Sequence, residues 1–180
     1  MADRPNRPQT PLDGNHHVTG ITSDVKANLD FWCRVMGLRF VKKTLNFETT
    51  FRYHTYYGDE TGDPGSVVTF LEFNEAPKAQ PGKGNIAAAI LRVGSYEALE
   101  YWMDRLTQEQ IFSEMIRLDP TQPTRLVFSD HEGHRVELIE SDAPDKPLAA
   151  PASDIPEEFR IRGIEGVRSY CNPDELSTAA

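Results

Sequence analysis

The chain carries an internal repeat with a period of about 70 residues. The segment NLDFW at residues 28–32 recurs as ALEYW at 98–102, and GSVVTF at 65–70 recurs as GHRVEL at 133–138. A repeat of this length is one supersecondary unit, and such a unit buries its apolar face against its copy. We therefore expect two structurally equivalent modules that share a core, with the functional site between them.

Each copy shows the pattern of a strand, a helix and further strands. In the first copy a helix follows the cap Ser23-Asp24, and its apolar residues are Val25, Leu29, Trp32 and Met36. In the second copy Ser95 caps a helix whose apolar residues are Leu99, Trp102, Met103 and Leu106. The expected strands are 16–22, 38–41, 50–57, 66–73, 86–93, 124–128 and 134–140. This pattern predicts an α+β fold of paired βαβββ modules.

Proline and glycine mark the expected boundaries between the modules. We expect a flexible arm at 1–13, a first module at 14–75, a linker at 76–84, a second module at 85–141 and a proline-rich linker at 142–160. Residues 161–167 (IRGIEGV) then resemble an opening strand again, and 172–175 resemble the start of the next helix. Residues 161–180 are therefore predicted to be the truncated start of a third module.

Composition excludes several classes of partner. The 180 residues carry a formal net charge of -9, whereas nucleic-acid binders concentrate Lys and Arg on one face, so no nucleic acid is expected. No apolar run suits a signal peptide or a bilayer span, so we expect no membrane partner and a cytoplasmic location. Cys33 and Cys171 form no close Cys-x-x-Cys pair and are expected to be reduced and structural.

Three segments resemble a known superfamily. Two segments of the first module, GNHHVTGITSDVKANLDFWCRVMGLRFVKKTLNF and YHTYYGDETGDPGSVVTF, resemble ring-cleaving dioxygenases of the vicinal-oxygen-chelate (glyoxalase/bleomycin-resistance) superfamily, in particular the hydroquinone-type dioxygenases. The second module's FSDHEGHRVELIE is similar to the general superfamily ending, Asp-x-x-Gly-x-x-x-Glu-Leu. The resemblance covers residues 14–170, and the first-module segments are specific to the subfamily.

The resemblance implies curved mixed β-sheets around a pocket, with the helices outside and a divalent metal, Fe(II) or Mn(II), inside. It also implies a small aromatic substrate, a hydroquinone or catechol, and O₂. In the hydroquinone-type enzymes the metal lies between the first and the fourth of four modules, and two histidines and a glutamate bind it. Only the first-module ligand, His17 by position, is present here, so the metal is either absent or completed by other modules.

The resemblance further implies that His16 and Thr19 orient the substrate and the ligand. Strand alternation agrees for Thr19, which shares a face with His17, but places His16 on the other face unless the strand is bulged.

A rival metal site follows from two-module relatives, which resemble glyoxalases and fosfomycin-resistance enzymes. Their ligand positions correspond to His17, Thr69, Ala87 or Ala88, and Glu137. Of these, only His17 and Glu137 are candidate metal ligands. Glu137 is alternatively a strand residue that pairs with Arg135 or Arg92.

The remaining histidines have other structural interpretations. His131 and His134 lie in a predicted turn, and His54 either lines the pocket or faces solvent.

Three functional hypotheses remain. The first is a ring-cleaving dioxygenase whose metal site is completed by a homodimer or by a partner that supplies the missing modules. The second is a small-molecule-binding protein that has kept the pocket without the metal. The third is an interaction fragment with an exposed edge strand. Metal content, ligand binding and oligomeric state separate the three.

Overall fold

The computed structural model describes residues 14–46, 51–78, 85–117, 119, 121–143, 146–152 and 154–170. The predicted arm at 1–13, most of the 76–84 linker and residues 171–180 of the predicted third module lie outside the described residues. The elements in chain order are β1 His17–Thr22, α1 Val25–Leu29, η1 Asp30–Val35, β2 Arg39–Leu45, β3 Tyr53–Gly58, β4 Val67–Glu72, β5 Ile86–Val93, α2 Tyr96–Gln108, β6 Ser113–Ile116, β7 Arg125–Ser129, β8 Arg135–Glu140, η2 Glu157–Phe159 and β9 Ile164–Ser169.

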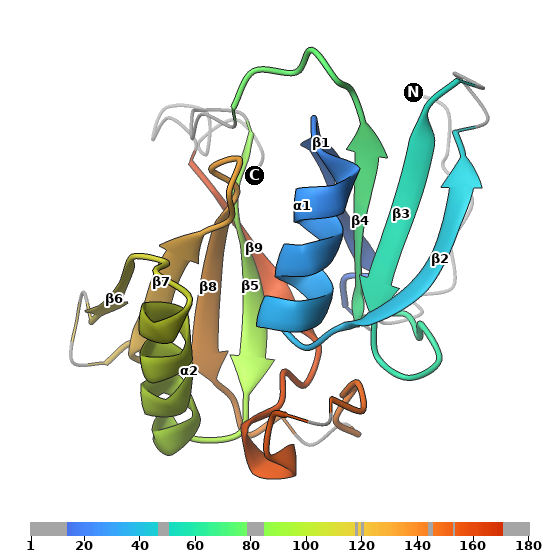
Figure 1. Cartoon of the computed structure of the whole chain (residues 1–180). Coiled ribbons are helices and arrows are strands. Elements are labelled where there is room, and N and C mark those ends of the chain that lie inside the picture. Colours follow the sequence, from blue (N-terminus) through green and yellow to red (C-terminus); the bar gives the residue numbers. More distant parts are fainter. Residues whose placement is uncertain are drawn as a thin grey trace, which may run out of the picture.

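The strands form two mixed sheets, one for each copy of the repeat (Figure 1). The first sheet has the order β1-β4-β3-β2 and the second has the order β6-β7-β8-β5-β9. In each copy the opening strand is parallel to the last strand, β1 to β4 and β5 to β8, while the other pairs are antiparallel. The predicted α+β fold of paired βαβββ modules is confirmed. Among the strands of the described residues, β6 is the one that the sequence pattern missed.

The first helix departs from the predicted apolar face. Asp24 caps α1 by accepting hydrogen bonds from the amides of Lys26 and Ala27, but from Asp30 the helix continues as wider π-helical turns in η1. A π-helix has more residues per turn than an α-helix, so the residues after Asp30 point in other directions around the helix axis than the predicted α-helical pattern implies. Phe31 and Val35 are therefore buried beside Trp32 and Met36, whereas Leu29 is 37% exposed.

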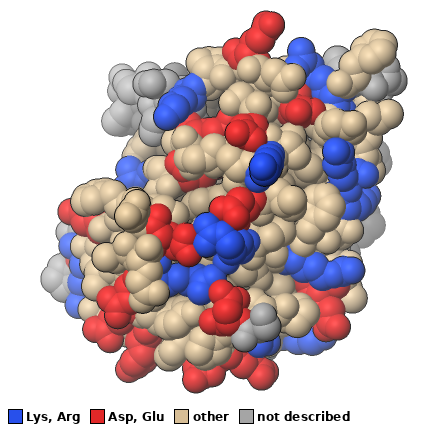
Figure 2. Space-filling model, in the orientation of Figure 1, with Lys and Arg blue, Asp and Glu red and all other residues tan. Residues whose placement is uncertain are grey.

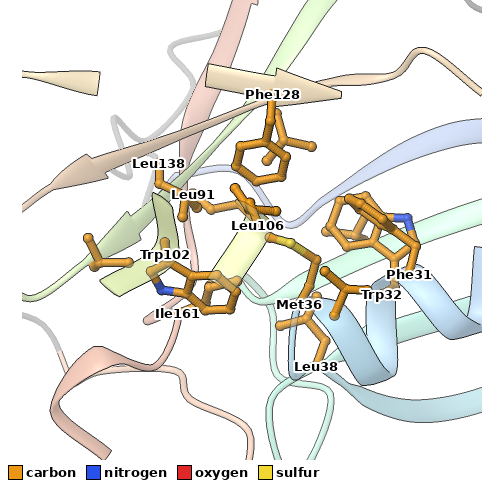
Figure 3. Packing of buried hydrophobic residues seen from close by; sticks show 14 of the residues in the cluster. Phe31, Trp32, Met36, Leu38, Leu91, Trp102, Leu106, Phe128, Leu138 and Ile161 are labelled. Atoms are coloured by element: carbon orange, nitrogen blue, oxygen red, sulfur yellow. The ribbon is translucent and has the colours of Figure 1, made fainter. Parts of the chain in front are cut away.

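One hydrophobic core joins the two modules. Figure 3 shows Phe31, Trp32, Met36 and Leu38 of the first module facing a group from the second that includes Leu91, Trp102, Leu106, Phe128 and Leu138. Polar bonds reinforce this contact, since the Arg105 guanidinium in α2 donates to the carbonyl oxygens of Arg34 and Val35 at 2.6 and 2.8 Å. Neither module is complete without the other, as the repeat predicts.

The proline-rich segment after β8 packs onto α2. Ile155 is buried, and the indole N–H of Trp102 donates to the carbonyl oxygen of Phe159 at 2.8 Å. The chain then enters β9, which pairs antiparallel with β5 at the edge of the second sheet. Residues 164–169 thus form a strand within the segment that is predicted to open a third module, and this strand pairs with the second module.

The side of the molecule that carries both helices shows Lys and Arg intermingled with Asp and Glu (Figure 2). Within the described ranges, no helix has the length and apolar composition needed to cross a membrane.

Candidate functional site

His16 and His17 lie side by side at the start of β1, and both are exposed. Their Nδ1 atoms are 3.0 Å apart, at hydrogen-bonding distance, and their rings meet edge to face. His16 precedes the strand, and its carbonyl oxygen accepts a hydrogen bond from the amide of Gly65. Strand alternation therefore does not keep the two rings apart.

Thr19 lies on the same face of the first sheet as His17. It is paired with Thr69 of β4, and the Thr69 hydroxyl donates to Oγ1 of Thr19 at 2.8 Å. Thr69 is fully buried, so this bond fixes the rotamer of Thr19 next to the histidines. The structure thus brings His16, His17 and Thr19 together.

Glu137 lies on the second sheet, in the middle of β8, and is fully buried. Arg168 of β9 binds both of its carboxylate oxygens at 2.7 Å, and Arg125 of β7 donates to Oε2 at 3.1 Å. Arg135 lies 3.8 Å from Oε1. Burial acts to raise the pKa of the Glu137 carboxyl, but the bonds from Arg168 and Arg125 outweigh it, so the pKa lies below its usual value.

These contacts decide how Glu137 fits the role of a metal ligand. Its charge is already balanced by guanidinium groups that bond to both oxygens, and a metal would have to displace them. The alternative interpretation, in which Glu137 is a strand residue paired with arginine, agrees with the geometry. Its main partners, however, are Arg168 and Arg125. Arg92 instead lies 4.0 Å from Glu165. The sequence analysis missed Arg125 and Arg168. Arg125 lies on the neighbouring strand β7, and Arg168 lies on β9, on the far side of β5, so both approach Glu137 only because of strand order and register.

A complete metal site is not assembled from the described residues. No group of three or more His, Cys, Asp or Glu side chains gathers anywhere in the part of the chain that the structure describes. His17 and Glu137 belong to different sheets. Of the rival positions, Thr69 is bonded to Thr19, and Ala87 and Ala88 are buried alanines without ligand atoms.

The second-module histidines form a turn, as predicted. Oδ1 of Asp130 accepts the amides of Glu132 and His134, and Oδ2 lies 2.9 Å from Nδ1 of His134. Burial acts to lower the pKa of His134, but Asp130 outweighs this effect and raises it.

The cysteine prediction is tested only at Cys33. Cys33 forms no disulfide in the described ranges, and burial raises its pKa to about 11, so it is poorly reactive. Cys171 lies outside the described residues.

The cavity beside Thr19 is small. A cavity of about 100 Å³ lies between β1, β5 and β8, and Thr19, Trp32, Phe70, Ala88 and His134 contribute to its lining. This is below the roughly 150 Å³ of a cavity known to hold benzene. A wider groove of about 600 Å³ begins beside His16 and runs past Gly65 and Leu148. The cavity beside Thr19 alone does not provide room for a substituted ring.

Comparison with known proteins agrees with this architecture. The chain is 38% identical over 155 residues to "Putative ring-cleaving dioxygenase MhqA" of Bacillus subtilis, covering 85% of this chain and 48% of the relative. It is 26% identical over 170 residues to "Chlorohydroquinone/hydroquinone 1,2-dioxygenase" of Sphingobium indicum, covering 91% of this chain and 51% of the relative. The chain thus spans about half the length of the curated relatives it matches.

Solved structures and a family model lead to the same grouping. A crystal structure of a "putative dioxygenase" from Bacillus subtilis superposes with a TM-score of 0.82 at 28% identity, covering 91% of this chain and 52% of that one. The model of the Glyoxalase/Bleomycin resistance protein/Dioxygenase superfamily matches residues 14–138. The chain therefore belongs to the Glyoxalase/Bleomycin resistance protein/Dioxygenase superfamily.

Proposed function

We propose that the chain forms one half of a ring-cleaving dioxygenase that acts on a hydroquinone or catechol with a divalent metal, Fe(II) or Mn(II). The observation that carries the proposal is His17, an exposed imidazole at the start of β1, in a chain whose curated relatives are described as ring-cleaving dioxygenases. An imidazole suits either metal as a ligand. Thr19 and His16, which lie beside it, would position the ligand and the substrate.

The metal does not fit the described residues alone. His17 offers one ligand, and the carboxylate of Glu137 is held by Arg168 and Arg125. The proposal therefore requires that the other ligands come from modules outside the described residues, or from a second copy or a partner. The β9 strand is consistent with the opening of a further module at 161–180.

A second candidate function is that of a small-molecule-binding protein without metal. It is favoured by the engagement of Glu137 with arginines and by the alanines at 87 and 88, which leave the second module without ligand atoms where two-module relatives are expected to have them. This candidate keeps the groove beside His16 and dispenses with the metal.

Metal content of the anaerobically purified protein, loaded with Fe(II) or Mn(II), tests the proposal. We expect stoichiometric metal in the wild type, its loss in His17→Ala, and its retention in the control His131→Ala, which changes an exposed turn histidine. Oxygen uptake with hydroquinone should fall more than about 100-fold in His17→Ala, beyond the range for residues that only orient a ligand. Column chromatography of the same samples gives the oligomeric state.

Two outcomes contradict the proposal. Metal that remains bound in His17→Ala would show that His17 is not a metal ligand. A wild-type protein that takes up no metal and still binds hydroquinone would favour the metal-free binding protein.

A further inference from the structure

A groove lies between η1 and the β6 edge of the second sheet. Its volume of about 670 Å³ falls within the range of small-molecule sites. Many of its lining residues are apolar, among them Phe31, Val35, Ile111, Phe112 and Val127. Phe112 is 83% exposed, so the groove presents an aromatic ring to solvent. The candidate metal ligands His17 and Glu137 do not line this groove, which is therefore separate from the candidate metal site.

Arg135 brings a positive charge to the wall of the groove. It is the first residue of β8 and lines both this groove and the small cavity beside Thr19. Its side chain is 32% exposed, so a ligand in the groove can reach the terminal nitrogens of the guanidinium. Ser129 of β7 also lines the groove and is paired in register with Arg135, which places the Ser129 hydroxyl on the same face of the sheet.

The guanidinium of Arg135 is not hydrogen-bonded to a carboxylate among the described residues. Its Nε lies 3.8 Å from Oε1 of Glu137, which is too long for a hydrogen bond, and this nitrogen is buried without a hydrogen-bond partner. Both oxygens of Glu137 are instead bound by Arg168, and Arg125 binds one of them as well. Three guanidinium groups thus surround one carboxylate, so this part of the second sheet carries an excess of positive charge.

The acidic side chains that line the groove do not neutralise this charge; they are Asp30, Glu109, Glu114 and Asp130. Asp30 and Glu109 both bind Arg34, at 2.8 and 2.6 Å. Asp130 is buried and holds the turn before β8. Glu114 lies on β6, two strands away from β8. An anion in the groove would therefore find its counter-charge at Arg135.

These features together select a carboxylate that carries an apolar chain. A guanidinium group presents parallel N–H donors that match the two oxygens of a carboxylate, and a serine hydroxyl can donate one further bond. An aliphatic chain on the same ligand would remove the apolar wall of the groove from water. An inorganic oxyanion would satisfy the donors but would leave that wall hydrated.

We propose that the groove binds a monocarboxylate with an apolar chain. The terminal nitrogens of Arg135 and the hydroxyl of Ser129 hold the carboxylate, and the chain lies along the apolar wall that includes Phe112. This binding site requires neither a metal nor His17, so it goes beyond the proposed ring-cleaving function and does not depend on it.

Binding of hexanoate and hexanamide to the whole chain, followed by NMR titration, tests the proposal. Hexanamide has the shape of hexanoate without its charge. The wild type should prefer hexanoate about tenfold, the ratio that a charge-assisted hydrogen bond provides. Arg135→Gln should abolish this preference, and Ser129→Ala should lower it about threefold. The control is Arg39→Gln, which removes an exposed guanidinium from β2 of the first sheet and should leave the preference unchanged.

The wild type also supplies a readout that does not depend on the variants folding. The Nε resonance of Arg135 should move with hexanoate and stay in place with hexanamide. Acetate should bind more than about tenfold more weakly than hexanoate, because it lacks the methylene groups that cover the apolar wall. A preference that persists in Arg135→Gln, a stationary Nε resonance, equal affinity for acetate and hexanoate, or no binding of hexanoate to the folded wild type would overturn the proposal.

Discussion

Replacing Glu137 by glutamine is expected to lower the free energy of unfolding by about 3–5 kcal/mol, the cost of breaking a buried ion pair on one side. Glu137 is fully buried, and its carboxylate binds Arg168 through both oxygens and Arg125 through one. Glutamine keeps the size of the side chain but leaves two guanidinium groups without their counter-charge. Denaturant unfolding of the wild type and the variant measures the difference.

The same substitution has an expected pH dependence. The pKa of folded Glu137 lies below its usual value of 4.5, so its stabilising contribution is present above about that pH and is lost as the pH falls through the folded-state value. The wild type should therefore lose its advantage over Glu137→Gln in acid. A difference that stays constant from neutral to acid pH would show that charge pairing is not its source.

Glu140→Gln is the matched control, because Glu140 lies at the exposed end of the same strand. It should change the free energy of unfolding by less than about 0.5 kcal/mol. Amide hydrogen exchange adds a local readout, since Arg168 belongs to β9 and Glu137→Gln should speed exchange there. Equal changes in the free energy of unfolding and in amide exchange for Glu137→Gln and Glu140→Gln would contradict the assigned role of Glu137 in holding β9 to the second sheet.

Replacing Trp102 by alanine is expected to cost about 3–5 kcal/mol of stability, as for other buried large-to-small changes. Trp102 is fully buried in the core shared by the two modules, and its indole N–H holds the carbonyl oxygen of Phe159. Tyr96→Ala, at a 44% exposed position of the same helix, is the control and should cost far less. Thermal unfolding of the two variants tests this, and comparable losses would contradict the core assignment.

The repeat offers a second comparison for this tryptophan. Trp32 occupies the equivalent position in the first module and is equally buried, but its indole N–H has no hydrogen-bond partner in the described structure. Trp102→Phe should therefore destabilise the protein by about 1 kcal/mol more than Trp32→Phe, since only the former removes a formed bond.

The sequence predicted the features that depend on local order. Helix caps at Asp24 and Ser95 act within a few residues, and both accept the expected amide hydrogen bonds. The repeat predicted the paired modules because each copy needs its equivalent to bury an apolar face. The π-helical turns that bury Phe31 and Val35 lie beyond such patterns, because the change in helical period is decided by packing in the core.

The features of the candidate site likewise fall into those that the sequence predicted and those that the tertiary structure decided. Sequence alone placed His17 and Thr19 on one face, since alternation along a strand is a local property. The partners of Glu137 and the unpaired nitrogen of His54 were decided by the tertiary structure. Arg168 reaches Glu137 from a strand on the far side of β5, and His54 lies across β4 from Ile21. Such contacts depend on strand order and register, and these are set when the sheets assemble around a shared core.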